Sequence, residues 1–342
     1  MPKVSLAALP VSALFAVAKP SGPTSMTIIN DIKQLVAGSR LFVEAEKLEE
    51  RKRKAKSNGS HSRGNRMRDV VKIGQGGTLD PLADGVLVVG VGKGTKRLND
   101  LLEGAKEYRT TALLGCETDT YDSEGARVRL APWHHVTKEN VESALEQFRG
   151  EILQTPPIFS ALKMDGKPLY EYARKGIPLP RPIEKRKVTI YSLDLIEWKG
   201  DDHTFRWPEK QLSVEEKKAV EMALGGVEDN PTLKDEPDHA APDQTPTAFV
   251  LSMKVSGGSY VRSIVHDLGR AVGSSAHVVT LTRTRQSRFT LNVTEPEDKG
   301  CVPWEIFQKA LEEEGEADED GWKDWERAVM DKLEIIDGKK TT

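Results

Sequence analysis

Between residues 74 and 85 the chain reads Gly74-Gln75-Gly76-Gly77-Thr78-Leu79-Asp80-Pro81-Leu82-Ala83-Asp84-Gly85. Three glycines precede Asp80, and a proline follows it directly. Glycine permits left-handed backbone and close approach by a bulky partner, and proline fixes φ and donates no ladder hydrogen bond. The segment therefore predicts a stiff turn that holds one carboxylate in a defined place. The simpler alternative is that Asp80 serves only as a turn residue, which is the commoner role of Asp near Gly.

The regions on either side predict a mixture of strands and helices. Val86–Val91 is a continuous apolar run typical of a buried strand, and Phe249–Val255 alternates as a half-buried strand does. Helical spacing of apolar residues follows Ser25, which is a candidate N-cap. The alternation slips between Ile190 and Leu193, which predicts a β-bulge. Because the elements follow no regular βαβ period and no internal repeat, the expected fold class is α+β.

Length and composition exclude several classes of protein. The chain has 342 residues, 37% of them hydrophobic and 30% charged, which suits one large domain or two ordinary ones. Cys116 and Cys301 are the only cysteines, so a disulfide framework and a Cys-rich zinc site are excluded. The apolar run Leu6–Ala18 imitates a secretory signal, but Pro10 interrupts it and it is too short to span a bilayer. We therefore expect a buried strand there and an intracellular protein that is not secreted.

Charge is distributed unevenly along the chain. Residues 199–247 carry a net charge of −6 and residues 295–342 one of −9, whereas Arg51–Lys72 contains nine bases and a single acid. A basic body with acidic appendages is typical of a protein that binds a polyanion. The basic stretch is interpreted as a solvated loop, an RNA contact or a nuclear import signal, and these alternatives stay open.

Five segments of the chain resemble, in order, the motifs of the TruB family of tRNA pseudouridine synthases. The segment around Asp80 is similar to the catalytic motif of that family, G-x-LDP-x-A-x-G. The other four segments are Lys19–Ser25, Lys106–Gly125, Gln154–Tyr170 and Ser256–Gly269. The resemblance implies a pseudouridine synthase fold of the α+β class. In that fold a central mixed, largely antiparallel sheet is flanked by helices, and here charged insertions are added to it.

The resemblance also implies roles for individual residues. Asp80 is the implied nucleophile, which attacks the target uridine at its ribose so that uracil leaves, rotates and rejoins through carbon. Arg262 beside it would favour the ionised carboxylate, and Tyr108 would stack on the flipped-out base and move a proton. The implied substrate-binding residues are Tyr260, Leu281, Gln75, Gly77, Leu79, Lys19 and Pro20. No metal and no cofactor are implied. Each residue taken singly has a simpler explanation. Arg262 could form a charge pair that serves only folding, and Tyr108, Tyr260 and Leu281 could be core residues.

One position departs from the family pattern. Many members have a His five positions before the catalytic Asp, where this chain has Gln75. Gln can hydrogen-bond and fill the same space, but it does not titrate near neutrality. Activity is expected to survive if this position only packs or hydrogen-bonds, and to be impaired if a proton must be transferred there.

The resemblance suggests a division of the chain. Residues 1–294 are expected to form the catalytic domain, with a basic insertion at about residues 40–70 and an acidic one at residues 199–247. Residues 295–342 are expected to form an acidic helical extension and no PUA domain, which is the small RNA-binding module of the bacterial, archaeal and guide-dependent members. The chain therefore looks like the stand-alone eukaryotic type, which modifies uridine 55 in the T loop of tRNA.

Three hypotheses on function follow. The first is a tRNA pseudouridine-55 synthase; the second is an RNA-binding or tRNA-folding factor with dispensable catalysis; the third is a guide-RNA-dependent rRNA pseudouridine synthase. The expected partner is the T arm of tRNA, and mRNA is a further candidate. We expect a monomer with no membrane and no obligate protein partner. A nuclear location rests on the basic cluster alone, and a mitochondrial share is an expectation from the family.

Overall fold

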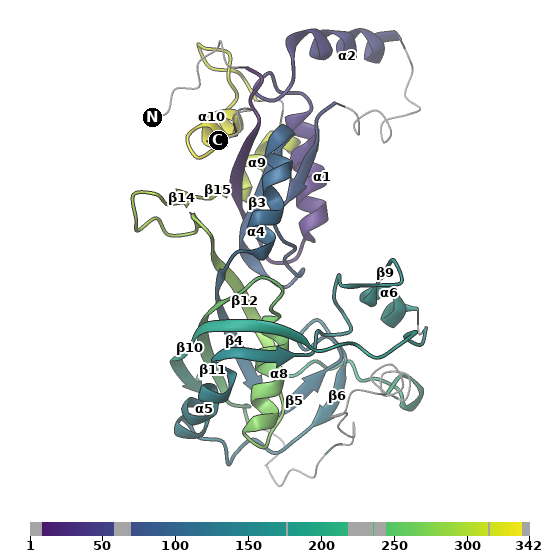
Figure 1. The fold of residues 1–342 in the computed structure, drawn as a ribbon, viewed down its shortest axis with the longest axis vertical. Helices are drawn as coiled ribbons and strands as arrows, with labels where there is room; N and C mark the ends of the chain where they lie inside the picture. Colours follow the sequence, from purple (N-terminus) through teal and green to yellow (C-terminus); the bar gives the residue numbers. More distant parts are fainter. Residues whose placement is uncertain are drawn as a thin grey trace. The chain divides into compact units, whose positions relative to one another are not determined.

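The predicted runs of apolar residues form the strands of two units in the computed structural model. The structure describes residues 9–57, 70–175, 177–217, 235, 244–313 and 315–336. The first unit consists of residues 1–106 and 283–342, and the second consists of residues 107–282. Figure 1 draws both units as a ribbon whose colours follow the sequence.

The first unit is made from both ends of the chain. Its elements are β1 (Ala13–Lys19), α1 (Ser25–Val36), α2 (Ala45–Ser57), β2 (Ile73–Gln75), β3 (Asp84–Val91), the 3-10 helix η2 (Gly92–Arg97), α4 (Leu98–Glu103), β13 (Phe289–Thr290), β14 (Lys299–Gly300), β15 (Val302–Pro303), α9 (Trp304–Glu312), α10 (Asp324–Met330) and β16 (Glu334–Ile335). The bounds of two longer strands, β4 (Lys106–Leu114) and β12 (Ala276–Gln286), include residues of both units.

The middle of the chain forms the second unit. Its elements are β5 (Cys116–Thr118), β6 (Arg127–Leu130), α5 (Lys138–Ala144), the 3-10 helix η3 (Leu145–Phe148), β7 (Gly150–Gln154), β8 (Lys163–Met164), β9 (Lys167–Pro168), α6 (Leu169–Arg174), β10 (Arg186–Gly200), β11 (Ala248–Val255) and α8 (Val261–Ala271).

Strands in the first unit follow the order β15-β1-β3-β12. β1 and β3 are antiparallel and in register from Ala13 opposite Val91 to Lys19 opposite Gly85. The short strand β2 also pairs with β3, so the segment that contains Asp80 leaves the sheet after β2 and re-enters it as β3. The turn predicted around this residue is therefore held by strands at both of its ends.

The hydrophobic core of the first unit includes an aromatic stack. Phe15 of β1 stacks on Phe42 at a centroid distance of 6.3 Å and on Phe307 of α9 at 6.2 Å. Phe307 also contacts Trp304 and Trp325. These contacts join β1 to helices α9 and α10, which lie near the other end of the chain.

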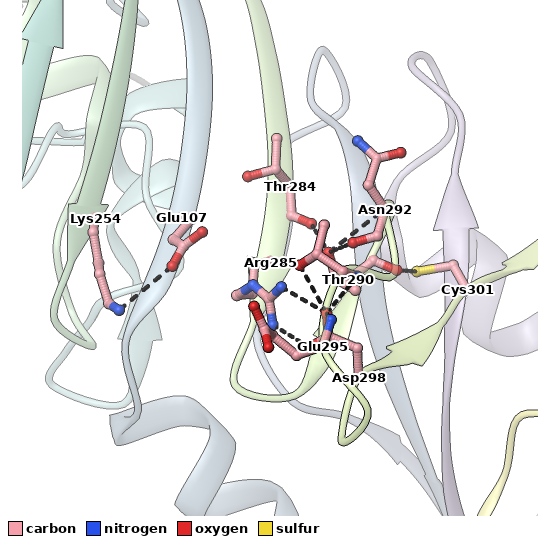
Figure 2. Close-up of polar contacts among 10 residues, drawn as sticks. Glu107, Lys254, Thr284, Arg285, Thr290, Asn292, Glu295, Asp298 and Cys301 are labelled. Atoms are coloured by element: carbon pink, nitrogen blue, oxygen red, sulfur yellow. Dashed lines mark hydrogen bonds and ion pairs between the residues drawn. The ribbon is translucent and has the colours of Figure 1, made fainter.

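The buried carboxylate of Asp298 organises the loop that precedes β14 (Figure 2). Asp298 accepts hydrogen bonds from the Arg285 guanidinium at 2.5 and 2.9 Å and from the backbone N–H groups of Thr294 and Glu295, both at 3.0 Å. The arginine and the two N–H groups hold the pKa of Asp298 well below its usual range. The loop before β14 is therefore fixed by an ionised side chain.

Strands in the second unit follow the order β12-β4-β11-β10-β7. β10 is antiparallel to both β11 and β7, and its register with β11 shifts between Ile190 and Ser192. This shift confirms the predicted bulge. Helix α8 begins after Tyr260 and buries most of its residues.

The expected fold class is confirmed, because helices accompany a mixed sheet in which the antiparallel pairs predominate. The predicted N-cap of α1 is wrong. Thr24 occupies that position, and its side chain accepts a hydrogen bond from the Thr27 N–H at 3.1 Å. Ser25 does not cap the helix because its hydroxyl binds the backbone of Leu79 instead.

The segment predicted as an acidic extension contributes strands as well as helices. β15 pairs in parallel with β1, and β16 pairs with β1 in antiparallel fashion. The described part of residues 295–342 thus belongs to the sheet of the first unit, while the domain boundary at residue 294 stays a prediction.

Several predictions fall partly outside the described residues. These are the first residues of the apolar run, part of the basic insertion and about half of the acidic insertion. Within the described residues, Ala13–Lys19 is a buried strand as expected. In the same ranges, none of the helices is long and apolar enough to cross a membrane.

Candidate active site

The Asp80 segment forms a turn that close backbone contacts support. Gly77 has a φ of 138° and Gly85 one of 101°, conformations that side chains other than glycine rarely adopt. The Asp80 carbonyl accepts from the Ala83 N–H at 3.1 Å, and the Pro81 carbonyl accepts from the Gly22 N–H at 2.8 Å. Asp80 itself is half-buried. The predicted stiff turn around one carboxylate is what the structure contains.

Ser25 fixes the residue that precedes Asp80. Its buried hydroxyl donates to the Leu79 carbonyl at 2.9 Å and accepts from the Leu79 N–H at 2.8 Å. One side chain thereby satisfies both polar groups of a residue that lies outside any strand. The Leu79 side chain is itself buried.

Lys19 holds the residues that follow Asp80. Its side chain is 1% exposed, and its ammonium donates to the carbonyls of Pro81 at 3.2 Å, Ala83 at 2.5 Å and Pro20 at 2.9 Å. A buried ammonium needs such partners, because an unpaired charge out of water is costly. The resemblance implies that Lys19 belongs to the substrate-binding residues as support of the site floor; within the first unit it binds the backbone of the turn.

Two residues of β12 that the sequence did not reveal complete the support of the turn. Arg283 is 1% exposed and donates to the carbonyls of Gly77 at 2.9 Å and Val86 at 2.7 Å. Gln286 is fully buried and donates to the Gly76 carbonyl at 2.5 Å. The one available signal was the run of long polar residues, Arg283, Arg285 and Gln286, at the end of a strand whose first four residues are buried.

Close beside Arg283, the side chain of Lys106 is buried at the start of β4. Its ammonium donates to the carbonyls of Leu102 at 2.5 Å and Gly104 at 2.8 Å. Burial and the positive charge of Arg283 lower the pKa of Lys106 to about 8.

Gln75 occupies the position at which the family pattern has His. Its amide nitrogen donates to the Thr78 hydroxyl at 3.1 Å and lies 4.0 Å from the Met26 sulfur. Its amide oxygen is buried and has no hydrogen-bond partner among the described residues. The side chain therefore supports the start of the turn through its hydrogen bond to Thr78, and its amide oxygen remains available as an acceptor.

The second unit brings Tyr260 and Arg262 together at the start of α8. Gln154 of β7 accepts from the Tyr260 N–H at 2.8 Å and donates to the Tyr260 carbonyl at 3.0 Å. One residue further along the helix from Arg262, the Ser263 hydroxyl donates to the Thr155 carbonyl at 2.9 Å. Gln154 and Thr155, at and just after the end of β7, thus hold the backbone of Tyr260 before Arg262 and the side chain of Ser263 after it.

The guanidinium of Arg262 is buried and bound from two directions. It donates to the Thr120 carbonyl at 2.5 Å and to the Phe159 carbonyl at 2.9 Å. Its Nε atom lies 3.8 Å from a carboxylate oxygen of Asp122, and both side chains are about 95% buried. These contacts fix the orientation of a permanently charged group.

The structure places the predicted site residues in two groups. Gln75, Gly77, Leu79, Asp80, Lys19 and Pro20 belong to the first unit, and Tyr108, Tyr260, Arg262 and Leu281 belong to the second. Tyr108 is a half-buried residue of β4, and Leu281 is a buried residue of β12. Their functional roles stay predictions. Within the described ranges, no group of three or more His, Cys, Asp or Glu residues is placed to hold a metal ion.

Comparison with known proteins identifies the family. Residues 65–215 match the TruB family pseudouridylate synthase N-terminal domain. The tRNA pseudouridine synthase 4 of Schizosaccharomyces pombe is 40% identical over 347 residues, which cover 86% of this chain and 82% of that protein. The chain belongs to the TruB family. The tRNA pseudouridine synthase 4 of Saccharomyces cerevisiae is 34% identical over 88% of this chain and 84% of that protein. Mouse pseudouridylate synthase TRUB1 is also 34% identical, over 88% of this chain and 71% of that protein.

Solved structures share the fold of this TruB-family chain. A chain of a Cbf5–Nop10–Gar1 complex matches with a TM-score of 0.50 and 20% identity, covering 94% of this chain and 60% of that one. A chain of the archaeal box H/ACA Nop10–Cbf5 complex matches with a TM-score of 0.50 and 18% identity, covering 97% and 62%. The TruB-family chain thus spans about six tenths of the length of those two chains, and at this identity the likeness extends to the fold alone.

Proposed function

We propose that this chain isomerises uridine 55 in the T loop of tRNA to pseudouridine, with Asp80 as the nucleophile. The observation that carries the proposal is the bracing of the Asp80 turn in a chain of the TruB family. Side chains from β1, α1 and β12 bind the backbone on both sides of a single half-buried carboxylate. A nucleophile held this firmly loses little entropy when it reaches its target atom.

In the proposed reaction every atom of the substrate is kept. The Asp80 carboxylate attacks C1′ of the ribose, and the bond from C1′ to N1 of uracil breaks. The base turns within the pocket, its C5 atom bonds to C1′, and the ester to Asp80 is released. A proton then leaves C5, and N1 gains one. The product is an isomer, so the reaction consumes no co-reactant.

The residues of the second unit are assigned two roles: Arg262 favours the charged form of the nucleophile, and the other residues contact the base or line its pocket. The Arg262 guanidinium, fixed by Thr120 and Phe159, would favour the ionised nucleophile by charge pairing. Tyr108 would stack on the flipped-out base and exchange a proton with it. Tyr260, whose backbone Gln154 holds, and Leu281 would line the pocket.

A tRNA substrate is supported by the names of the relatives, two of which are tRNA pseudouridine synthases. An unpaired loop suits an enzyme that must extrude a base, because unstacking there is less costly than in a duplex. We also propose that the chain acts as a monomer without a guide RNA, with mRNA as a secondary substrate. Its basic stretch Arg51–Lys72 supports a nuclear location, and a mitochondrial share is proposed from the family alone.

The decisive experiment uses the purified chain and its Asp80→Ala variant on an unmodified tRNA transcript. Pseudouridine is mapped by a chemical stop assay, and tRNA affinity is measured in parallel. We expect a stop at the T-loop uridine with the parent and none with the variant, at similar affinity for tRNA. Tight binding without product from the parent would instead favour a tRNA-folding factor. Product that forms only after a guide RNA is added would favour the guide-dependent alternative.

A further inference from the structure

Helix α8 presents three residues at intervals of one helical turn to a single segment of the second unit. Arg262, His266 and Arg270 are separated by four residues each, so they lie on one face of the helix. Each contacts the stretch from Glu117 to Asp122, which begins in β5 and continues into the connection to β6. We call this arrangement the three-contact ladder.

The outer contacts of the ladder are ionic. Arg270 donates to both carboxylate oxygens of Glu117, at 2.7 and 2.8 Å, and Arg129 donates to one of them at 3.0 Å. At the other end, Arg262 contacts Asp122 and the carbonyl of Thr120 as described above. Glu117 is 2% exposed, so its end of the ladder is a well-satisfied buried anchor.

The middle contact is a stack of two rings. Tyr121 lies on His266 with a centroid distance of 3.8 Å and an angle of 11° between the ring planes. Tyr121 has a φ of 64°, a left-handed conformation that is uncommon for a residue with a large side chain. Its backbone is fixed there, since its N–H donates to Thr118 at 3.1 Å and its carbonyl accepts from Val278 at 3.0 Å.

The strained tyrosine lies between Thr120 and Asp122, which both contact Arg262. Thr120 supplies a carbonyl to the guanidinium, and Asp122 supplies a carboxylate that the Thr120 hydroxyl also binds at 2.6 Å. If Tyr121 returned to a relaxed conformation, both groups would turn with it. Strained residues of this kind persist only where the surroundings enforce them, and they concentrate at functional sites.

We propose that Tyr121 and His266 are a positioning pair that sets the orientation of Arg262. The pair acts through the backbone of Thr120 and the carboxylate of Asp122, and it touches no substrate. The catalytic consequence rests on the function proposed above, in which Arg262 favours the ionised nucleophile. The geometric consequence, a fixed guanidinium, does not depend on that function.

The ring of His266 acts here as a flat surface. Burial lowers the pKa of His266 to about 4, against the opposing effect of Glu117, so the ring is neutral at physiological pH. Its Nδ1 atom is buried and has no hydrogen-bond partner among the described residues. A phenyl ring should therefore replace the imidazole in the stack.

The test compares His266→Ala with His266→Phe. We expect His266→Ala to lower kcat by about tenfold or more, because an arginine displaced by about 1 Å loses its alignment, while KM for tRNA stays within about twofold. His266→Phe should restore most of kcat. Val265→Ala is the matched control: Val265 is fully buried in the same helix, and its truncation should lower the melting temperature without lowering kcat.

A second readout separates this inference from the proposed function. The Nε–H resonance of Arg262 is followed by NMR in the parent and both His266 variants. We expect a slowly exchanging signal in the parent and in His266→Phe, and a broadened one in His266→Ala, whether or not the chain makes pseudouridine. An unchanged signal and unchanged kcat in His266→Ala would overturn the proposal. So would a loss that His266→Phe fails to restore, since that would assign the role to the imidazole nitrogens.

Discussion

Ser25 shows how a single hydroxyl controls the candidate nucleophile. It is the only side chain found to bind both the N–H and the carbonyl of Leu79 among the described residues. We predict that Ser25→Ala costs about 1–3 kcal/mol of unfolding free energy, since two buried backbone groups lose their partner. Its kcat should fall by about tenfold, because the carboxylate of Asp80 loses its fixed position. Denaturant unfolding and single-turnover kinetics measure the two effects.

The neighbouring Thr24 supplies the control for Ser25. Its side chain caps α1 by accepting from the Thr27 N–H, so its hydrogen bonding serves the helix and not the backbone of Leu79. Thr24→Ala should therefore cost about 1 kcal/mol of stability, as N-cap losses do, with kcat unchanged. Equal kinetic losses in the two variants would mean that helix α1, and not the Ser25 hydroxyl, positions the turn.

Gln75 provides a prediction on the one departure from the family pattern. Its contacts are a hydrogen bond to Thr78 and an approach to Met26, both of which a His side chain could replace. We expect Gln75→His to keep kcat within about threefold of the parent, with no new titration between about pH 5.5 and 7.5. A pH–rate profile of both proteins checks this. A large increase in kcat for Gln75→His, with a pH dependence that follows the titration of imidazole, would show that the parent lacks a proton transfer at this position.

At the residue scale, the sequence singled out the residues assigned to the chemistry, whose roles stay predictions, more readily than the residues that support them. Asp80 stood out because glycines and a proline surround it, and Arg262 was implied by a motif. Ser25 and Gln154 lie in segments that resemble family motifs, but the hydrogen bonds that Ser25, Arg283 and Gln154 make to distant backbone leave no spacing signal in the sequence. Such contacts are found only when the partners are seen in space.

At Gly85, near the start of β3, the backbone of β12 lies so close that there is no room for a side chain. A Cβ atom on Gly85 would lie 2.3 Å from the Arg283 carbonyl oxygen, a backbone atom that cannot yield easily. We predict that Gly85→Ala lowers the unfolding free energy by about 4 kcal/mol or more, an exceptional loss for one substitution. Gly22→Ala is the matched control, because Gly22 has a similar φ of 108° and a Cβ atom there would meet nothing within 4 Å. That variant should lose only about 1–2 kcal/mol, the cost of a left-handed conformation.

The loop before β14 makes a prediction about pH. Asp298 has a lowered pKa because Arg285 and the N–H groups of Thr294 and Glu295 favour its ionised form. A group of this kind adds stability above its unfolded pKa, near about 4, and loses it as the pH falls through the folded value. Asp298→Asn should therefore lower the melting temperature at pH 7 more than at about pH 2.5. A deficit that is the same at both pH values would show that shape, and not charge, holds the loop.

Elements with a strong apolar pattern were predicted well, and their ends less so. β3 and β11 follow the apolar runs closely, and the bulge in β10 appears where the alternation slips. The start of α1 was misplaced by one residue, because the sequence alone cannot show which of Thr24 and Ser25 has another partner. Very short strands such as β15 and β16 have too few residues for any periodicity to be visible.

At the scale of the whole molecule, the first unit joins segments that are far apart in sequence. β1 pairs with β3 on one side and with β15 and β16 on the other, so the strand has partners from both ends of the chain. The sequence predicts an acidic helical extension there and no strands, because net charge reports on the surface and not on strand pairing. Tryptophans and a phenylalanine within that acidic stretch were the available sign of a buried face.

Phe307 makes this arrangement testable. It is fully buried and stacks on Phe15, although 292 positions separate the two in the chain. Phe307→Ala should cost about 3–5 kcal/mol, as large-to-small core changes do. Hydrogen exchange should then accelerate in β1 and β3, while amides in β10 and β11 keep the protection of the parent, because the second unit has its own core. Acceleration of equal size in all four strands would contradict this, and would mean that the two units unfold as one cooperative body.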